Sequence, residues 1–380
     1  MKNQFSIPLI FLLFVMGCSI DSGETKKKAN NPYASWYQVA SGKPAALVFA
    51  SYKTTMIADG NDEALLRISA VDSAGMEIMD ATLPFTISVK GDAIEILKNH
   101  GFNYIRLRIF VNPENELGYS PNSGFCGLDS TLMMARRVKK AGLNLLLDFH
   151  YSDTWADPQK QFKPKAWQEL SFNDLSTRLN TYTKLVLLKL KEQETMPEMV
   201  QIGNEINHGI VWPEGHISNL DQLAELLKAG TRAVREIDTS CKVMMHLALG
   251  GQNEETVFWF DNMIARGVEF DIIGLSYYPR WHCTLDDLNN NMLDILQRYQ
   301  KDINVVEYSA FKREVNNLVF ELPENRGNGT CIWEPLNTWS RIFDSDGNAL
   351  KEINIYDEIK AEYLPDWQLP EIGVLYLVDF

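Results

Sequence analysis

Two glutamates at the ends of apolar segments are the residues whose type and placement most clearly indicate chemistry. Glu205 ends the run MVQIGNE that starts at Met199, and Glu307 ends the run INVVE that starts at Ile303. Short apolar runs of this kind are typical of buried strands. The two glutamates are 307 − 205 = 102 residues apart, so only the fold can bring them together. Two carboxylates at one sheet edge can hydrolyse a glycosidic bond, one as proton donor and the other as nucleophile or base.

Further polar and aromatic residues are concentrated just after the predicted strands. Arg106 and Arg108 alternate along one strand, so both can face its inner side. We expect one of them to hydrogen-bond Glu307 and lower its pKa, and the sequence does not say which. Glu205 should have the higher pKa, because an acid must hold its proton. The other candidates for substrate contact are Asp148, His150, Asp153, Trp155, Asn204, Asn207, His246, Tyr277, Trp281, His282, Trp333 and Glu334.

These residues are positioned by an alternation of helices and strands that begins at residue 92. Helices are predicted at 92–100, 128–141, 175–192, 220–237, 256–266, 285–299 and 314–320. Strands are predicted at 103–110, 143–149, 199–203, 242–248, 272–276, 303–306 and 330–333. The simplest closed arrangement of this α/β pattern is a (β/α)8 TIM barrel with its active site at the carboxyl ends of the strands. An open doubly wound sheet is the alternative, but no glycine-rich phosphate loop follows any strand.

Five of these segments resemble glycoside hydrolase family 53, the arabinogalactan endo-β-1,4-galactanases. They are DFHYSDTWADP (148–158), GNEIN (203–207), SYYPRWH (276–282), VVE (305–307) and WEP (333–335). The resemblance covers residues 92–363. It implies a TIM barrel, retention of anomeric configuration and action on the β-1,4-galactan side chains of pectin, with Glu205 as the acid/base and Glu307 as the nucleophile. Two alternatives stay open: another retaining barrel glycosidase of mannanase or xylanase type, or a surface galactan-binding protein with weak catalysis.

The chain departs from the family pattern at two places. Family members have an additional strand before the helix that corresponds to 92–100, whereas here a β-rich segment runs directly into that helix. We therefore expect the segment 85–89 either to occupy the first barrel position beside 103–110 or to leave the barrel incomplete there. After Glu307, the aromatic residue and proline usual in the family are replaced by YSAFK (308–312).

The amino-terminal residues of the chain predict export. Residues 1–17 resemble a lipoprotein signal peptide with Cys18 as the lipidated residue, and 18–44 is a polar tether. Residues 45–91 form a β-rich segment that resembles bacterial immunoglobulin-like modules. Residues 92–365 are expected to form the barrel, and 366–380 a tail. We expect a protein anchored by lipid in the cell envelope, at the outer membrane of a bacterium. Secretion after ordinary signal cleavage is the alternative.

Composition narrows the choice of partners. The 380 residues carry a formal net charge of −14, with no basic stripe, which argues against nucleic acid as a partner. We expect a monomer that acts on a polysaccharide without a cofactor or metal. A metal site at Asp148, His150, Asp153 and Asp157, or a structural calcium as in some family members, is a minor alternative, because no dense Asp/Asn loop is present. The spacing of Cys126, Cys241, Cys283 and Cys331 matches no zinc site.

Overall fold

The computed structural model describes residues 46–51, 66–71, 73, 93–121, 123–336, 341–344 and 347–365. The chain divides into two compact units, and along the sequence the main boundary falls between residues 89 and 90. In the first, β1 (Ala46–Ser51) pairs antiparallel with β2 (Leu66–Val71). The predictions for residues 1–44, for the strand at 85–89 and for the tail at 366–380 lie outside the described residues. No described helix has the length and apolar character needed to cross a bilayer.

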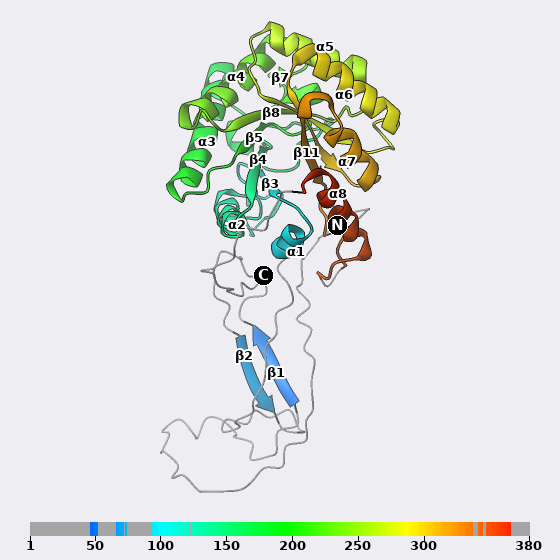
Figure 1. Ribbon diagram of the computed structural model, residues 1–380. Coiled ribbons are helices and arrows are strands. Elements are labelled where there is room, and N and C mark those ends of the chain that lie inside the picture. The colour runs from blue at the N-terminus through cyan, green and yellow to red at the C-terminus, as the bar shows by residue number, and fades with distance from the viewer. Residues whose placement is uncertain are drawn as a thin grey trace. The chain divides into compact units, whose positions relative to one another are not determined.

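The second unit alternates helices with parallel strands (Figure 1). Its sheet contains β3 (Tyr104–Ile109), β4 (Asn144–Phe149), β5 (Met199–Ile202), β8 (Lys242–Leu247), β9 (Ile272–Tyr277), β10 (Asp302–Tyr308) and β11 (Gly327–Ile332). The helices are α1 (Ala93–Asn99), α2 (Leu128–Lys140), α3 (Phe172–Glu192), α4 (Leu220–Ile237), α5 (Asn253–Ala265), α6 (Leu285–Tyr299), α7 (Lys312–Phe320) and α8 (Ile355–Tyr363). All seven predicted strands are present. The helix α8 and a short hairpin of β6 (Gly209–Ile210) with β7 (Gly215–His216) had no prediction.

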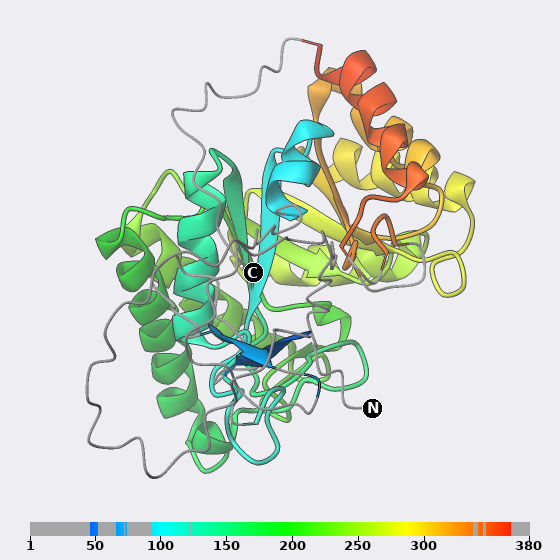
Figure 2. The ribbon, with the colours of Figure 1, turned by 90° about the horizontal axis from the view of Figure 1, so that it is seen from below.

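The order of strands in the sheet identifies the barrel class. Seven strands follow one another as β3-β4-β5-β8-β9-β10-β11, and each sheet neighbour is also the next of these strands along the chain. A doubly wound sheet would reverse its order at a switch point, so that alternative is wrong. The sheet curls and carries helices on its outer side, as the view from below also shows (Figure 2). The barrel fold is confirmed as a curled parallel sheet, and among the described residues β3 and β11 are its edges.

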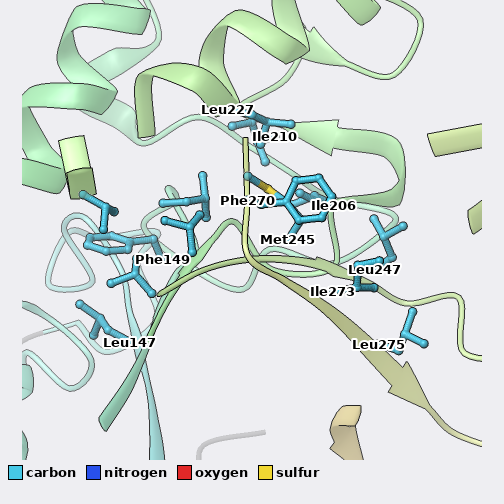
Figure 3. Close-up of a cluster of buried hydrophobic side chains, with 14 of the residues drawn as sticks. Leu147, Phe149, Ile206, Ile210, Leu227, Met245, Leu247, Phe270, Ile273 and Leu275 are labelled. Carbon is cyan, nitrogen blue, oxygen red and sulfur yellow. The ribbon is translucent and has the colours of Figure 1, made fainter. Parts of the chain in front are cut away.

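Alternation along the strands separates two cores. Outward residues such as Leu147, Met245 and Ile273 pack with the helices in the main apolar cluster (Figure 3). The inward residues near the strand starts form a second cluster of Leu146, Met199, Met244, Ile272 and Val306. Two positions further along β4, β5 and β8, the inward residues are Asp148, Gln201 and His246, all buried. The interior is therefore apolar near the amino ends of the strands and polar near their carboxyl ends, where barrel active sites lie.

An irregularity in β10 brings Glu307 to this polar layer. Because Val306 belongs to the inner cluster, strict alternation would direct Glu307 outward to the helices. The pairing of β10 with β9 shifts register between Val305 and Glu307, and its pairing with β11 shifts between Val305 and Tyr308. Such a bulge inserts one residue and redirects the side chain that follows. Glu307 consequently faces the same interior as Val306.

Candidate active site

The turn after β5 directs Glu205 toward Glu307. Gly203 has φ +86°, and a Cβ there would lie 2.5 Å from Ile206 Cγ2, so only glycine fits. Glu205 itself has the left-handed values φ 48° and ψ 56°, which are uncommon for residues other than glycine. One carboxylate oxygen of Glu205 and one of Glu307 lie within 4.8 Å of each other. The two glutamates predicted from the sequence therefore face each other across the carboxyl end of the sheet.

Arg106 is the centre of the polar layer. Its guanidinium donates to Glu307 Oε1 at 2.8 Å, to Asp148 Oδ2 at 2.9 Å and to Asn204 Oδ1 at 2.8 Å. Its Nε donates to Gln201 Oε1 at 3.3 Å. The carboxyl ends of β4, β5 and β10 are thus tied to one buried cation on β3. Burial raises the pKa of Asp148, but the charge of Arg106 and the hydrogen bond from His150 outweigh this effect and lower it below its usual value.

Arg108 has a different role from Arg106, although both face inward. It forms an ion pair with Glu334 at 3.0 Å, and its guanidinium carbon lies 4.4 Å from the centre of the Trp155 ring. Trp155 in turn contacts Trp333, with 5.7 Å between ring centres. The choice that the sequence left open is therefore settled. Arg106 contacts Glu307, whereas Arg108 contacts Trp155 and Glu334.

Glu307 is held by two donors. Besides Arg106, the Tyr278 hydroxyl donates to Glu307 Oε2 at 3.1 Å. Arg106 lowers the pKa of Glu307, as expected, but the net shift of this pKa is upward. Burial, with a contribution from Asp148, raises this pKa more than Arg106 and Tyr278 lower it. Both donors nevertheless favour the ionised carboxylate over the protonated form.

Glu205 has a more strongly raised pKa, as expected for an acid. Burial raises the pKa of Glu205 to about 8, the nearby charge of Glu307 adds to the effect, and the Ser276 hydroxyl and Arg106 oppose it. Ser276 Oγ donates to Glu205 Oε1 at 2.7 Å. A carboxyl group with this pKa is largely protonated at neutral pH and can act as a general acid there.

This pKa predicts the alkaline limit of activity. If Glu205 must be protonated in the free enzyme, kcat/KM should fall as the pH rises through about 8. The acidic limit should reflect deprotonation of Glu307, so the pH dependence of kcat/KM should be bell-shaped. Initial rates on soluble galactan between pH 4 and 10 would measure it. An alkaline limit near pH 5 would contradict the raised pKa of the acid.

Trp281 is the most exposed aromatic residue among the predicted substrate contacts. It follows β9, its side chain is 51% exposed, and it lies edge-on to Tyr278 with 6.0 Å between ring centres. Tyr278 contacts Glu307, so an indole beside it is well placed to stack on a sugar ring. Nearby, burial lowers the pKa of His282 to about 4, and its neutral ring accepts the backbone N–H of Tyr278 at 3.0 Å.

Replacement of Trp281 should separate binding from stability. We expect Trp281→Ala to weaken the binding of galacto-oligosaccharides roughly two- to tenfold, because stacking on an aromatic face contributes about 0.5–1.5 kcal/mol. Isothermal titration calorimetry measures the affinity and thermal unfolding the stability. Phe258→Ala is the matched control, because Phe258 on α5 is 54% exposed. Equal affinities for the two variants would show that Trp281 is not a sugar platform.

Several predicted contact residues have protein partners that fix loops. Asp153 accepts from Asn112 N, Asn115 Nδ2 and Lys165 N, which joins the loops after β3 and β4. Asn207 pairs with the backbone of Ala248. Three further predicted contact residues, His150, Tyr277 and His246, are buried and hydrogen-bonded. His150 accepts from Ala156 N, and Tyr277 donates to Cys283 O. His246 lies between Gln201 and Ser276. These contacts give each of the five residues a structural role in the site.

Four residues of the site had no prediction. Gln201 and Ser276 are inward strand positions, Tyr278 contacts Glu307, and Gln161 Nε2 donates to the carbonyl oxygens of Asn204 and Glu205 at 2.8 and 3.4 Å. The period of two along β5 and β9 could have identified Gln201 and Ser276. The role of Gln161 depends on the path of a long loop and leaves no such pattern.

One group of possible metal ligands coincides with the site. Oxygens of Glu205 and Glu307 and a ring nitrogen of His246 lie within 4.8 Å of one another. Both nitrogens of His246 already have protein partners, however: Nδ1 contacts Gln201 Nε2 at 3.0 Å and Nε2 contacts Ser276 Oγ at 2.8 Å. Because a ligating imidazole must give a nitrogen lone pair to the metal, this donor set does not suit one, and the proposals below use none.

A curled parallel sheet with two facing carboxylates at its carboxyl edge is the arrangement of a barrel glycoside hydrolase. Comparison with known proteins gives the family. The sequence profile of glycosyl hydrolase family 53 matches residues 68–317, and the chain belongs to this family. An uncharacterized protein of Niallia circulans is 48% identical over 319 residues, which cover 69% of this chain and 85% of that protein.

Two further relatives agree with this assignment. The arabinogalactan endo-beta-1,4-galactanase of Thermothelomyces thermophilus is 31% identical over 310 residues, which are 70% of this chain and 90% of that protein. Among solved structures, the catalytic domain of a family 53 glycoside hydrolase from Ignisphaera aggregans superposes with a TM-score of 0.66 at 32% identity. That match covers 77% of this chain and 91% of the other.

Proposed function

We propose that the protein is an endo-acting, retaining glycoside hydrolase that cleaves β-1,4-galactan, the side chain of type I arabinogalactan in pectin. The observation that carries the mechanism is the separation of under 4.8 Å between oxygens of Glu205 and Glu307. Retaining enzymes hold their carboxyl groups about 5–5.5 Å apart, whereas inverting enzymes leave about 6.5–9.5 Å for a water molecule. The substrate rests on the galactanase activity named for the Thermothelomyces relative.

In the first step, a Glu307 oxygen attacks the anomeric carbon while Glu205 gives its proton to the glycosidic oxygen. The bond to the leaving sugar breaks, and a galactosyl ester forms on Glu307. Arg106 and Tyr278 donate to Glu307, so they keep the attacking carboxylate oriented. The Asn204 amide donates one N–H to Ala156 O at 2.9 Å and has a second N–H for the sugar 2-hydroxyl.

In the second step, Glu205 takes a proton from a water molecule that attacks the ester, and Glu307 leaves as a carboxylate. The change of role follows from the charge of Glu307, which raises the pKa of Glu205 in the free enzyme. That charge is absent from the ester, so the pKa of Glu205 falls when the intermediate forms. The same group can then act as a base.

Turnover of the substrate tests the proposal directly. The purified chain should release galacto-oligosaccharides of several lengths from soluble β-1,4-galactan, as endo action requires, and should leave mannan and xylan intact. Chromatography of the products measures both. Release from mannan or xylan instead would show a different substrate. Tight binding of galactan without turnover would show a binding protein.

A further inference from the structure

A closed ring of hydrogen bonds links the backbone of Glu205 to its own carboxylate. Glu205 N donates to His246 Nδ1 at 3.3 Å, His246 Nε2 lies 2.8 Å from Ser276 Oγ, and Ser276 Oγ lies 2.7 Å from Glu205 Oε1. His246 and Ser276 are both fully buried, each with 0% of its surface exposed. The ring therefore joins strand ends of β5, β8 and β9.

The partners of His246 determine its tautomer. A backbone N–H can only donate, so Nδ1 must accept from Glu205 N. Gln201 Nε2 also donates to Nδ1, and its amide orientation is fixed because Oε1 accepts from Arg106 while Nε2 faces Asp148 Oδ1. Asn204 Oδ1 lies 3.1 Å from Nδ1 but accepts from Arg106. The ring proton is consequently on Nε2, and burial keeps the imidazole neutral by lowering its pKa well below the usual value.

This tautomer fixes the direction of the next two hydrogen bonds. His246 Nε2–H donates to Ser276 Oγ, which leaves the serine hydroxyl proton directed at Glu205 Oε1. Oε1 is then an acceptor in both protonation states of Glu205, because it is the only acceptor that the described residues offer to the Ser276 hydroxyl proton. The exchangeable proton of Glu205 is left for Oε2.

We infer that Ser276 is a positioning residue that, oriented by His246, reserves Oε1 of Glu205 and commits proton transfer to Oε2. The inference rests on the proposed function, because it assumes that Glu205 is the acid/base. It adds that a hydroxyl on the fifth strand of the described sheet decides which oxygen faces the glycosidic bond. A carboxyl free to rotate would present the wrong oxygen, or the wrong angle, for part of the time.

The other charged and titratable groups that face Glu205 come from five neighbouring segments. They are Glu307 on β10, Arg106 on β3, Asp157 in the loop after β4, His246 on β8 and Tyr278 after β9. Replacements at Ser276 leave all five in place. Because a donor to the carboxylate is lost, the alkaline limit of kcat/KM should move to higher pH in Ser276→Ala, by about one unit.

The test compares Ser276→Ala, Ser276→Thr and a control, Thr183→Val. Thr183 is a buried hydroxyl that pairs with Tyr151 at 2.8 Å, away from the site. We expect Ser276→Ala to lower kcat/KM on galactan roughly 10- to 100-fold, the range for a lost hydrogen bond to a charged group, with the shifted alkaline limit. Ser276→Thr keeps the hydroxyl, so its kcat/KM and its alkaline limit should both be close to those of the wild type. Thr183→Val should match the wild type in pH dependence.

A second substrate separates positioning from a general loss of structure. A dinitrophenyl galactobioside has a leaving group that needs no proton, so kcat/KM for it should be nearly equal in Ser276→Ala and wild type. Loss on both substrates, or an unchanged pH profile on galactan, would overturn the inference alone. Inactive wild type would overturn the proposed function and the inference with it. If Ser276→Ala does not fold, Ser276→Cys, with a weak donor of similar size, gives the same comparison.

Discussion

Glu307→Gln should abolish turnover of galactan while leaving the fold and the binding of galactan largely intact. Glutamine keeps the size of the side chain. Its amide oxygen can accept from Arg106 in place of Glu307 Oε1, and its amide N–H can donate to the Tyr278 hydroxyl oxygen in place of the bond to Oε2. It cannot form the ester, so kcat should fall at least about 10⁴-fold, as expected when a nucleophile is removed. Initial rates on galactan measure the loss, and calorimetry measures the remaining affinity.

The matched control is Glu198→Gln. Glu198 precedes β5 at the opposite end of the sheet, where it accepts from Leu145 N and pairs with Lys139. The variant Glu198→Gln should retain the wild-type rate. A loss of activity in Glu307→Gln alone would then result from the position of Glu307 in the active site and not from the removal of one negative charge. Wild-type turnover in Glu307→Gln would remove the nucleophile assignment.

Arg106→Met should have the second-largest effect, on stability as well as activity. Arg106 donates to Glu307, Asp148, Asn204 and Gln201, and methionine leaves two buried carboxylates without their cation. Breaking a buried ion pair by removing one partner costs roughly 3–5 kcal/mol. The pKa of Glu307 should rise further, so a larger fraction of the nucleophile is protonated and kcat/KM falls most at low pH. Urea unfolding and the pH dependence of kcat/KM measure the two effects.

Arg298→Met is the control for this variant. Arg298 pairs with Asp294 on the exposed face of α6, and exposed pairs of this kind contribute about 0–1 kcal/mol. If Arg106→Met does not fold, Arg106→Lys keeps one charge without the four-way contact and should lower activity with a smaller loss of stability. Equal urea midpoints for Arg106→Met and Arg298→Met would contradict the central position given to Arg106.

The strands could be predicted because each carries a strong local signal. Runs such as LLLDF and IIGLSY in β4 and β9 are apolar, short and separated by amphipathic helices. The position of Glu205 and Glu307 at one edge of the sheet also followed from sequence, because parallel strands end at the same edge. Helix α8 had no prediction, although α7, of the same length, was predicted.

Three features of the site depend on structure alone. The bulge in β10 that turns Glu307 inward is a property of pairing with β9 and β11. The net pKa of Glu307 depends on burial, which here outweighs the arginine beside it. The choice of Arg106 over Arg108 depends on position along β3. Arg108 lies two residues further along this strand, and its side chain contacts Glu334 and Trp155 instead of Glu307.

The anomeric form of the first product tests the central claim most directly. Double displacement through Glu307 inverts the anomeric carbon twice, so newly formed reducing ends should be β. Proton NMR during the first minutes of galactan hydrolysis, before mutarotation, distinguishes the two anomers. A β signal that appears first and later equilibrates with α is the predicted result. An α signal that appears first would show inversion and would contradict the roles assigned to Glu205 and Glu307.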